Sequence, residues 1–257
     1  MAASLLPVER AAIRNALATM TGATGHRLDE LTLELFGHFG MYFSDLVSTN
    51  REPAERFMKY VGRPAGAERL IPAEQGVIFL TAHVGNWELA GRLLAVGAAR
   101  PTHVVVAAEE ARELERWVRR DGDRVRFVPR SRPTVSLDLL AALRRGDVVA
   151  MQGDRALGTR GDVRVPFFGR PAPFPIGPFV LARAAAVPIV AAFCVLGAED
   201  RYTLRVCEPR TVKSGDEEDA LRAWVAHLED VVRHRPTHWF NFFDIWNPYE
   251  VGGGGRA

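Results

Sequence analysis

Cysteine is scarce in this sequence. Its 257 residues include only two, Cys194 and Cys207, which excludes the disulfide framework of a small secreted domain and favours a reducing, cytoplasmic environment. Both fall in segments that we predict below to be successive strands, so a single disulfide between them stays geometrically open.

Lysine is almost missing as well. The 33 basic residues are 31 arginines and two lysines, Lys59 and Lys213, and the formal net charge is only +2. So small a charge produces no broad cationic field, and no nucleic-acid partner is expected. Arginine pairs with phosphate and carboxylate through two parallel hydrogen bonds, so the ratio favours such partners, although a codon bias of the genome would produce the same ratio.

Long apolar runs are absent too. Residues 1–6 lack the basic and apolar stretches of a signal peptide, and neither a signal peptide nor an anchoring helix is expected. Residues 179–198 come nearest to a membrane span, but Arg183 and Pro188 divide them into a helix and a buried strand.

Several well-known motifs are also missing. The sequence has no Gly-x-Ser-x-Gly elbow, no Gly-x4-Gly-Lys-Ser/Thr loop, no Gly-x-Gly-x-x-Gly after a strand and no paired Cys-x2-Cys. These absences argue against hydrolases with that elbow, against nucleotide-binding enzymes and against structural zinc sites.

The composition that remains, 47% hydrophobic and 25% charged, is that of an ordinary folded protein. A chain of this length fits one α/β sheet around one core. We therefore predict a single domain over residues 1–250, with a helical N-terminal part up to about residue 62. The glycine-rich residues 251–257 are expected to form a disordered tail.

The spacing of apolar residues predicts an α/β fold. Residues 76–82 form a short continuous apolar run, as in a strand buried on both faces. Helices are predicted at 7–20, 28–47, 53–61, 86–96, 109–120, 134–145, 176–186 and 216–233, and further strands at 102–107, 125–128, 147–151, 187–195 and 202–206. This alternation predicts a largely parallel central sheet flanked by helices. Residues 152–177 are rich in Gly, Pro and Arg, so we expect a functional loop there.

His83 is the main candidate for chemistry, because catalytic groups of open α/β sheets gather at the carboxyl ends of strands. Imidazole accepts a proton near neutral pH, and Glu88 can face His83 from the next helical turn and fix its tautomer. Gly85 would leave room for substrate, Asn86 would cap the helix, and the free amides there would receive an oxyanion. By spacing alone, a structural histidine and a glutamate favoured by the helix dipole fit at least as well.

The residues around His83 resemble a family motif. Residues 81–91, Thr-Ala-His-Val-Gly-Asn-Trp-Glu-Leu-Ala-Gly, resemble the His-x4-Asp/Glu motif of the bacterial lipid A biosynthesis (lauroyl/myristoyl) acyltransferase family, in the lysophospholipid acyltransferase-like superfamily, and of its relatives that acylate mannosylated phosphatidylinositol. Residues 152–155, 160–161, 165–169 and 177–178 resemble the family's second signature, and 228–233, 236 and 239–240 its closing helix and aromatic tail. The resemblance covers about residues 25–246 and implies a glycerolipid acyltransferase-like fold.

The resemblance implies an acyltransferase that moves a fatty-acyl chain from an acyl-carrier-protein or acyl-CoA thioester to a hydroxyl or amine of a lipid or glycolipid, without a metal or another cofactor. His83 would be the general base and Glu88 its partner. Arg120 would hold a phosphate or polarise the thioester carbonyl, although a basic residue near a helix C-terminus is equally ordinary. Asp154 and Arg155 would complete the site or pair with each other.

The acyl chain requires an apolar groove beside His83, because each buried methylene contributes about 0.8 kcal/mol. The walls of this groove are predicted to come from the helices that flank the strands and from residues 166–178, with Phe167, Phe168 and Phe174 lining it unless these rings only anchor their segment on the core. A lipid acceptor implies peripheral association with the inner face of the cytoplasmic membrane, and the aromatic residues 239–246 are the first candidate for insertion.

Two other functions stay open. The chain could be a non-catalytic lipid- or acyl-carrier-binding protein, or an acyltransferase for a soluble specialised metabolite. A metal held by His83 and Glu88 would lack an evident third ligand. The other histidines are interpreted as surface or structural residues: His26, His38, His103, His227, His234 and His238.

Overall fold

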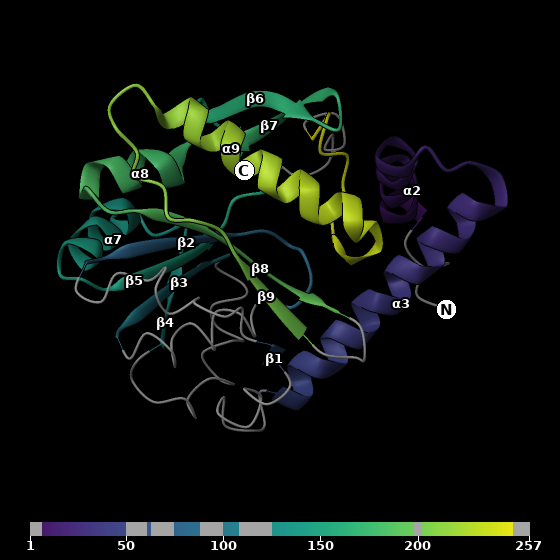
Figure 1. Ribbon diagram of the computed structural model, residues 1–257, viewed down its shortest axis with the longest axis horizontal. Helices are drawn as coiled ribbons and strands as arrows, with labels where there is room; N and C mark the ends of the chain where they lie inside the picture. Colours follow the sequence, from purple (N-terminus) through teal and green to yellow (C-terminus); the bar gives the residue numbers. More distant parts are fainter. Residues whose placement is uncertain are drawn as a thin grey trace.

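The computed structural model describes residues 7–49, 61–62, 75–87, 100–107, 125–197 and 202–248. These residues form a seven-stranded sheet with helices packed around it, and a separate two-stranded sheet (Figure 1). The helices predicted at 53–61, 86–96 and 109–120 and the tail predicted at 251–257 lie almost wholly outside the described residues.

The large sheet is mostly parallel, as predicted. Its strands in chain order are β1 (Val61–Gly62), β2 (Val77–Thr81), β3 (Thr102–Val106), β4 (Val125–Pro129), β5 (Val148–Gln152), β8 (Ile189–Leu196) and β9 (Tyr202–Val206). Their order in the sheet is β1-β9-β8-β2-β5-β3-β4, and only the β8–β9 pair is antiparallel. Strand β2 lies in the middle, and its apolar run is buried on both faces, which explains why it reads as continuous apolar sequence.

The described helices pack against this sheet and against one another. Their bounds are α2 (Pro7–Thr21), α3 (Gly25–Thr49), α7 (Val135–Arg144), α8 (Gly177–Ala185), α9 (Glu217–His234) and the short 3-10 helix η3 (Pro236–His238). Helices α8 and α9 lie together above the sheet, whereas α3 runs past the edge that carries β1 and β9 (Figure 1). None of the helices within the described ranges is long and apolar enough to cross a membrane.

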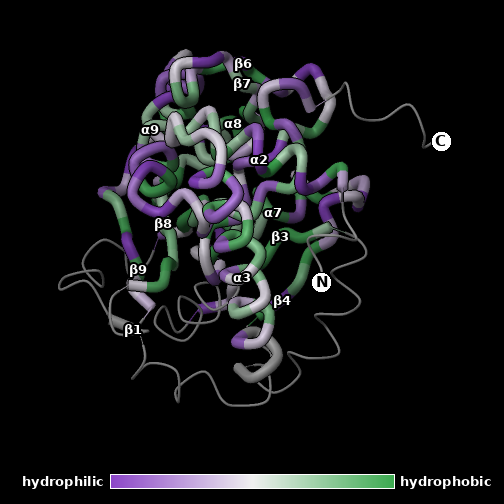
Figure 2. Tube along the Cα trace, turned by 90° about the vertical axis from the view of Figure 1, so that its right-hand side faces the viewer, coloured by the Kyte–Doolittle hydropathy of each residue, from purple (hydrophilic) through white to green (hydrophobic). Residues whose placement is uncertain are grey.

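Helix α9 shows how burial fixes a helix on the sheet. Its buried residues recur at helical spacing and include Leu221, Trp224 and Leu228. The indole N–H of Trp224 also donates a hydrogen bond of 3.1 Å to the carbonyl of Leu80, near the end of β2. Figure 2 shows hydrophobic residues in green along β3 and hydrophilic residues in purple on outer turns.

Residues 152–177, predicted as a loop, are largely a β-hairpin. Strands β6 (Asp162–Phe167) and β7 (Arg170–Pro175) pair antiparallel, and Phe168 and Gly169 form the turn, both with positive φ, as a two-residue hairpin turn requires. The prolines of β7 recur at alternate positions, so each can occupy a place whose missing N–H would point away from the partner strand. The loop prediction for residues 152–177 was wrong because the prolines of this segment lie in a strand pair.

Cys194 and Cys207 are both free thiols. Cys194 lies inside β8 opposite Leu204, whereas Cys207 follows the end of β9, so the antiparallel register separates them along the ladder. The disulfide that the sequence left open is not formed.

Candidate functional site

His83 lies just beyond the carboxyl end of β2, in a segment held on both sides by backbone hydrogen bonds. The N–H of Gly85 donates to the carbonyl of His238, and the N–H of Asn86 donates to the carbonyl of Cys194, at 2.9 and 2.8 Å. The carbonyl of His83 accepts from the N–H of Phe240 at 2.8 Å. The segment is therefore clamped between β8 and the C-terminal residues.

Gly85 is required by this clamp. Its φ is +60°, and a β-carbon added there would lie 2.0 Å from the carbonyl oxygen of Cys194. The space that we expected Gly85 to leave for substrate is thus filled by the protein's own backbone. Gly85 acts by letting the two chains approach.

The other members of the motif are placed only in part. Asn86 is buried, and its side-chain amide donates to the hydroxyl of Tyr202 at 3.4 Å. The helix that Asn86 was expected to cap, together with Glu88 and Arg120, lies outside the described residues.

Within the described residues, Asp154 is the carboxylate that contacts His83. Its Oδ1 lies 2.7 Å from His83 Nδ1, and its Oδ2 accepts from the backbone N–H of His83 and from the indole N–H of Trp239, each at 3.0 Å. The Asp154 side chain is only 1% exposed. Burial disfavours its charged form, but attraction to His83 and the hydrogen bonds from His83 and Trp239 outweigh this and lower the pKa of Asp154 to about 2.

The ionised Asp154 decides which nitrogen of His83 can act as a base. A carboxylate without a proton only accepts hydrogen bonds, so Nδ1 of His83 carries the proton. Nε2 is then the nitrogen with a free lone pair. The arrangement suits a general base whose imidazolium is stabilised by a buried negative charge.

The strand register brings these two residues together. Thr81 of β2 pairs with Gln152 of β5, and His83 and Asp154 each follow two residues later. The predicted strand at 147–151 puts Asp154 just beyond a strand end, as His83 is, but the sequence suggested Glu88 as the partner of His83. The signal that would have found Asp154 is the adjacency of the two parallel strands, which the sequence did not provide.

Phe167 and Phe174 pack in the core next to this site and do not line the pocket that contains His83. Both are fully buried, and the ring of Phe167 packs edge-on against Phe174 and Trp239, with centroids 5.5 and 5.4 Å apart. The indole N–H of Trp246 donates to the carbonyl of Phe167 at 3.2 Å. The alternative that these rings anchor their segment on the core is therefore favoured, and they also hold Trp239 against Asp154.

Phe168 lies at the tip of the hairpin, on α9. Its N–H donates to the carboxylate of Glu229 at 2.7 Å, and the guanidinium of Arg233 lies 4.9 Å from its ring centroid. Phe168 is not among the residues that line the pocket at His83.

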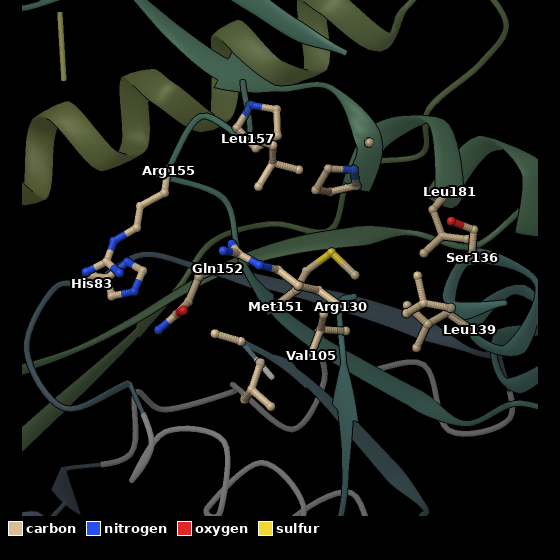
Figure 3. A pocket seen from close by; sticks show the side chains of 16 residues that line it. His83, Val105, Arg130, Ser136, Leu139, Met151, Gln152, Arg155, Leu157 and Leu181 are labelled. Carbon is tan, nitrogen blue, oxygen red and sulfur yellow. The ribbon is translucent and has the colours of Figure 1, made fainter. Parts of the chain in front are cut away.

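A pocket with a volume of about 260 Å³ opens beside His83 (Figure 3). Its walls come from the ends of β3 and β5 and from the first turns of α7 and α8, and most of them are apolar. The lining residues include Val105, Val106, Val135, Leu139, Met151, Leu157, Pro178 and Leu181, together with Arg130, Ser136, Gln152 and Arg155. The groove predicted beside His83 is present, and its walls come from the strand-flanking helices α7 and α8 and from residues 175–178, whereas the three phenylalanines do not line it.

Arg155 lines the His83 end of this pocket (Figure 3). Its guanidinium lies 5.9 Å from the ring centroid of Phe243, and its Nε is buried without a hydrogen-bond partner. Within the described residues it forms no salt bridge with Asp154, although its charge also helps to lower the pKa of that carboxyl. No three His, Cys, Asp or Glu side chains gather as metal ligands in the parts of the chain that the structure describes.

The known proteins that this chain resembles are acyltransferases. The sequence profile of the bacterial lipid A biosynthesis acyltransferases matches residues 29–247. Phosphatidylinositol mannoside acyltransferases from two strains of Mycobacterium tuberculosis, CDC 1551 / Oshkosh and ATCC 25618 / H37Rv, are each 24% identical over 220 residues. The alignments cover 84% of this chain and 69% of each relative.

Proposed function

Because the chain belongs to the bacterial lipid A biosynthesis acyltransferase family and is an acyltransferase, we propose that it moves a fatty-acyl chain from an acyl-carrier-protein or acyl-CoA thioester to a hydroxyl or amine of a lipid or glycolipid. The observation that carries this proposal is the 2.7 Å contact between His83 Nδ1 and the buried carboxylate of Asp154. It leaves Nε2 as the ring nitrogen with a free lone pair, and His83 lines an apolar pocket.

The chemical step uses His83 twice. Nε2 removes the proton of the acceptor O–H or N–H while the acceptor oxygen or nitrogen attacks the thioester carbonyl. The tetrahedral intermediate collapses, the C–S bond breaks, and the proton passes from His83 to the departing thiolate, which leaves as a thiol. Asp154 stays ionised and stabilises the imidazolium between the two proton transfers.

Glu88 keeps a part in this proposal as the second residue of the His-x4-Glu motif. Because Asp154 already accepts the Nδ1 hydrogen bond, Glu88 would stabilise the positive charge on the imidazolium without holding Nδ1. Arg120 stays proposed as the group that binds phosphate or polarises the thioester carbonyl.

The apolar pocket is proposed to hold the acyl chain. Leu139, Met151 and Leu181 offer the kind of wall that makes burial of methylenes favourable, at about 0.8 kcal/mol each. A lipid acceptor lies in a membrane, so we also propose that the protein associates peripherally with the inner face of the cytoplasmic membrane.

The experiment is an acyl-transfer assay on the purified protein. Carrier-protein and CoA thioesters of about eight to eighteen carbons are incubated with lipid extract, with thiol release measured and products identified by mass spectrometry. His83→Ala should lose at least about 10²-fold in rate, whereas the exposed His26→Ala should match wild type. Equal rates for His83→Ala and wild type would contradict the proposal. Donor binding without any turnover would favour the non-catalytic alternative, and acylation of only soluble acceptors the specialised-metabolite one.

A further inference from the structure

Two arginines in the pocket have no salt-bridge partner among the described residues, although Arg155 is attracted to the neighbouring carboxylate of Asp154. Arg130 follows β4 and Arg155 follows Asp154, and both line the cavity beside His83. Neither makes an ion pair or a side-chain hydrogen bond with any other described residue, and the described lining includes no Asp or Glu. The charged groups of this wall are therefore all cationic or, in His83, able to become so.

The positions of these side chains concentrate positive charge at one end of the pocket. Arg130 extends from its strand toward His83, and Arg155 lies beside His83 (Figure 3). Helices α7 and α8 start at the same pocket, where Ser136 and Gly177 line it, and the N-terminal turn of a helix carries partial positive charge. Arg130 is exposed and Arg155 is half-buried, so solvent already screens Arg130, but an anion placed between them would be attracted by both guanidinium groups and by the two helix N-termini.

We propose that Arg130 and Arg155 form a subsite for a phosphate group of one of the two co-substrates, which rests on the proposed function. Guanidinium groups bind phosphate oxygens through paired hydrogen bonds. Two guanidinium groups and the Ser136 hydroxyl together offer many hydrogen-bond donors. One carboxylate has only two oxygens to accept from them, whereas a phosphate group has more, so a phosphate matches the donors better. The phosphate belongs either to the pantetheine arm of the donor or to the headgroup of the acceptor.

The subsite is tested first without turnover. Isothermal titration calorimetry measures binding of inorganic pyrophosphate to wild type, Arg130→Gln and Arg126→Gln. Arg126 is the matched control, because it is an exposed arginine of the same strand that does not line the pocket. Arg130→Gln should raise the Kd about tenfold or more, because hydrogen bonds to charged groups are strong, and Arg126→Gln should leave it unchanged. Equal Kd values for all three proteins would overturn the proposal.

Steady-state kinetics then assign the phosphate to one co-substrate. A donor phosphate predicts that Arg130→Gln raises KM for acyl-CoA but not for an acyl-N-acetylcysteamine thioester, which has no phosphate. An acceptor phosphate predicts a raised acceptor KM with both donors, and no effect with a phosphate-free glycolipid. A KM that never differs from that of Arg126→Gln overturns the subsite. If wild type transfers no acyl group, the proposed function fails, and calorimetry still decides whether the subsite exists.

Discussion

Replacing Asp154 by asparagine is expected to abolish turnover while leaving the fold intact. The two side chains have the same shape, but an amide has one acceptor oxygen where the carboxylate has two. In the wild type, Oδ2 of Asp154 accepts from the backbone N–H of His83 and the indole N–H of Trp239, and Oδ1 accepts from His83 Nδ1. The asparagine oxygen should keep the position of Oδ2, because two N–H donors point at it.

The amide NH₂ group then faces His83 Nδ1 and donates to it. Nδ1 must become the acceptor, so the proton moves to Nε2, the nitrogen that has to accept the substrate proton. A base held in the wrong tautomer without its negative partner loses about 10³–10⁴-fold in kcat, by analogy with the same change in serine proteases. Thiol release with a saturating donor measures this loss, and ¹⁵N chemical shifts of the imidazole report the tautomer.

The chain provides a matched control for this change. His103 and Asp147 form a second buried histidine–aspartate contact, 2.9 Å from Nε2 to Oδ2, and neither lines the pocket. Asp147→Asn should lower the unfolding midpoint and leave kcat close to wild type. The reasoning is refuted if Asp154→Asn keeps more than about a tenth of the wild-type rate, or if Asp147→Asn loses activity as severely.

Four further predictions concern the clamp, the motif, the pocket and the pH dependence. Gly85→Ala should destabilise the protein by several kcal/mol, because the added carbon meets the Cys194 carbonyl at 2.0 Å in a left-handed backbone; urea unfolding checks this, and an unchanged midpoint contradicts it. Glu88→Gln should lower kcat less than His83→Ala does in the thiol-release assay, and equal activity with wild type would remove Glu88 from the mechanism. Leu139→Trp should shift donor preference toward shorter acyl chains, whereas Leu137→Trp, an exposed change on the same helix, should not; identical length profiles would place the acyl chain elsewhere. Burial, with His38 and Arg235 nearby, lowers the pKa of His238 to about 4, so between about pH 6.5 and pH 4 the unfolded chain binds a proton that the folded protein does not, and up to about 3 kcal/mol of stability should be lost as the pH falls through that window. Urea unfolding measured across this pH range should show a smaller loss of stability for His238→Gln than for wild type. An equal loss in both proteins would contradict this prediction.

Much of the fold followed from local pattern. The apolar run at β2 and the helical spacing of α7 and α9 are properties of short stretches, because burial on two faces or on one stripe selects residues directly. The β6–β7 hairpin was missed because its prolines and glycines are typical of loops. A strand accepts proline only where the missing N–H would not pair with the partner strand, and the sequence does not state which positions those are.

The sequence predicted His83 as the central residue of the site but not the residues that contact it. His83 was found because strand ends carry chemistry, but its contact with Asp154 depends on β2 and β5 being neighbours, and a sequence does not state strand order. Phe167 was assigned to the groove because a ring in a polar stretch suggested a ligand, whereas it packs against Trp239. Arg130 drew no attention because its position in the pocket arises only when β4 joins the sheet.

We expect His83 and Asp154 to act as one unit in acyl transfer. A double-mutant cycle on kcat measures this directly, with His83→Ala, Asp154→Asn and the combined variant compared in one assay. If the two residues work together, the combined variant is no slower than His83→Ala alone, because an oriented base that is absent cannot be misoriented. Losses that multiply, so that the combined variant is slower by the product of the two single effects, would show that His83 and Asp154 act independently.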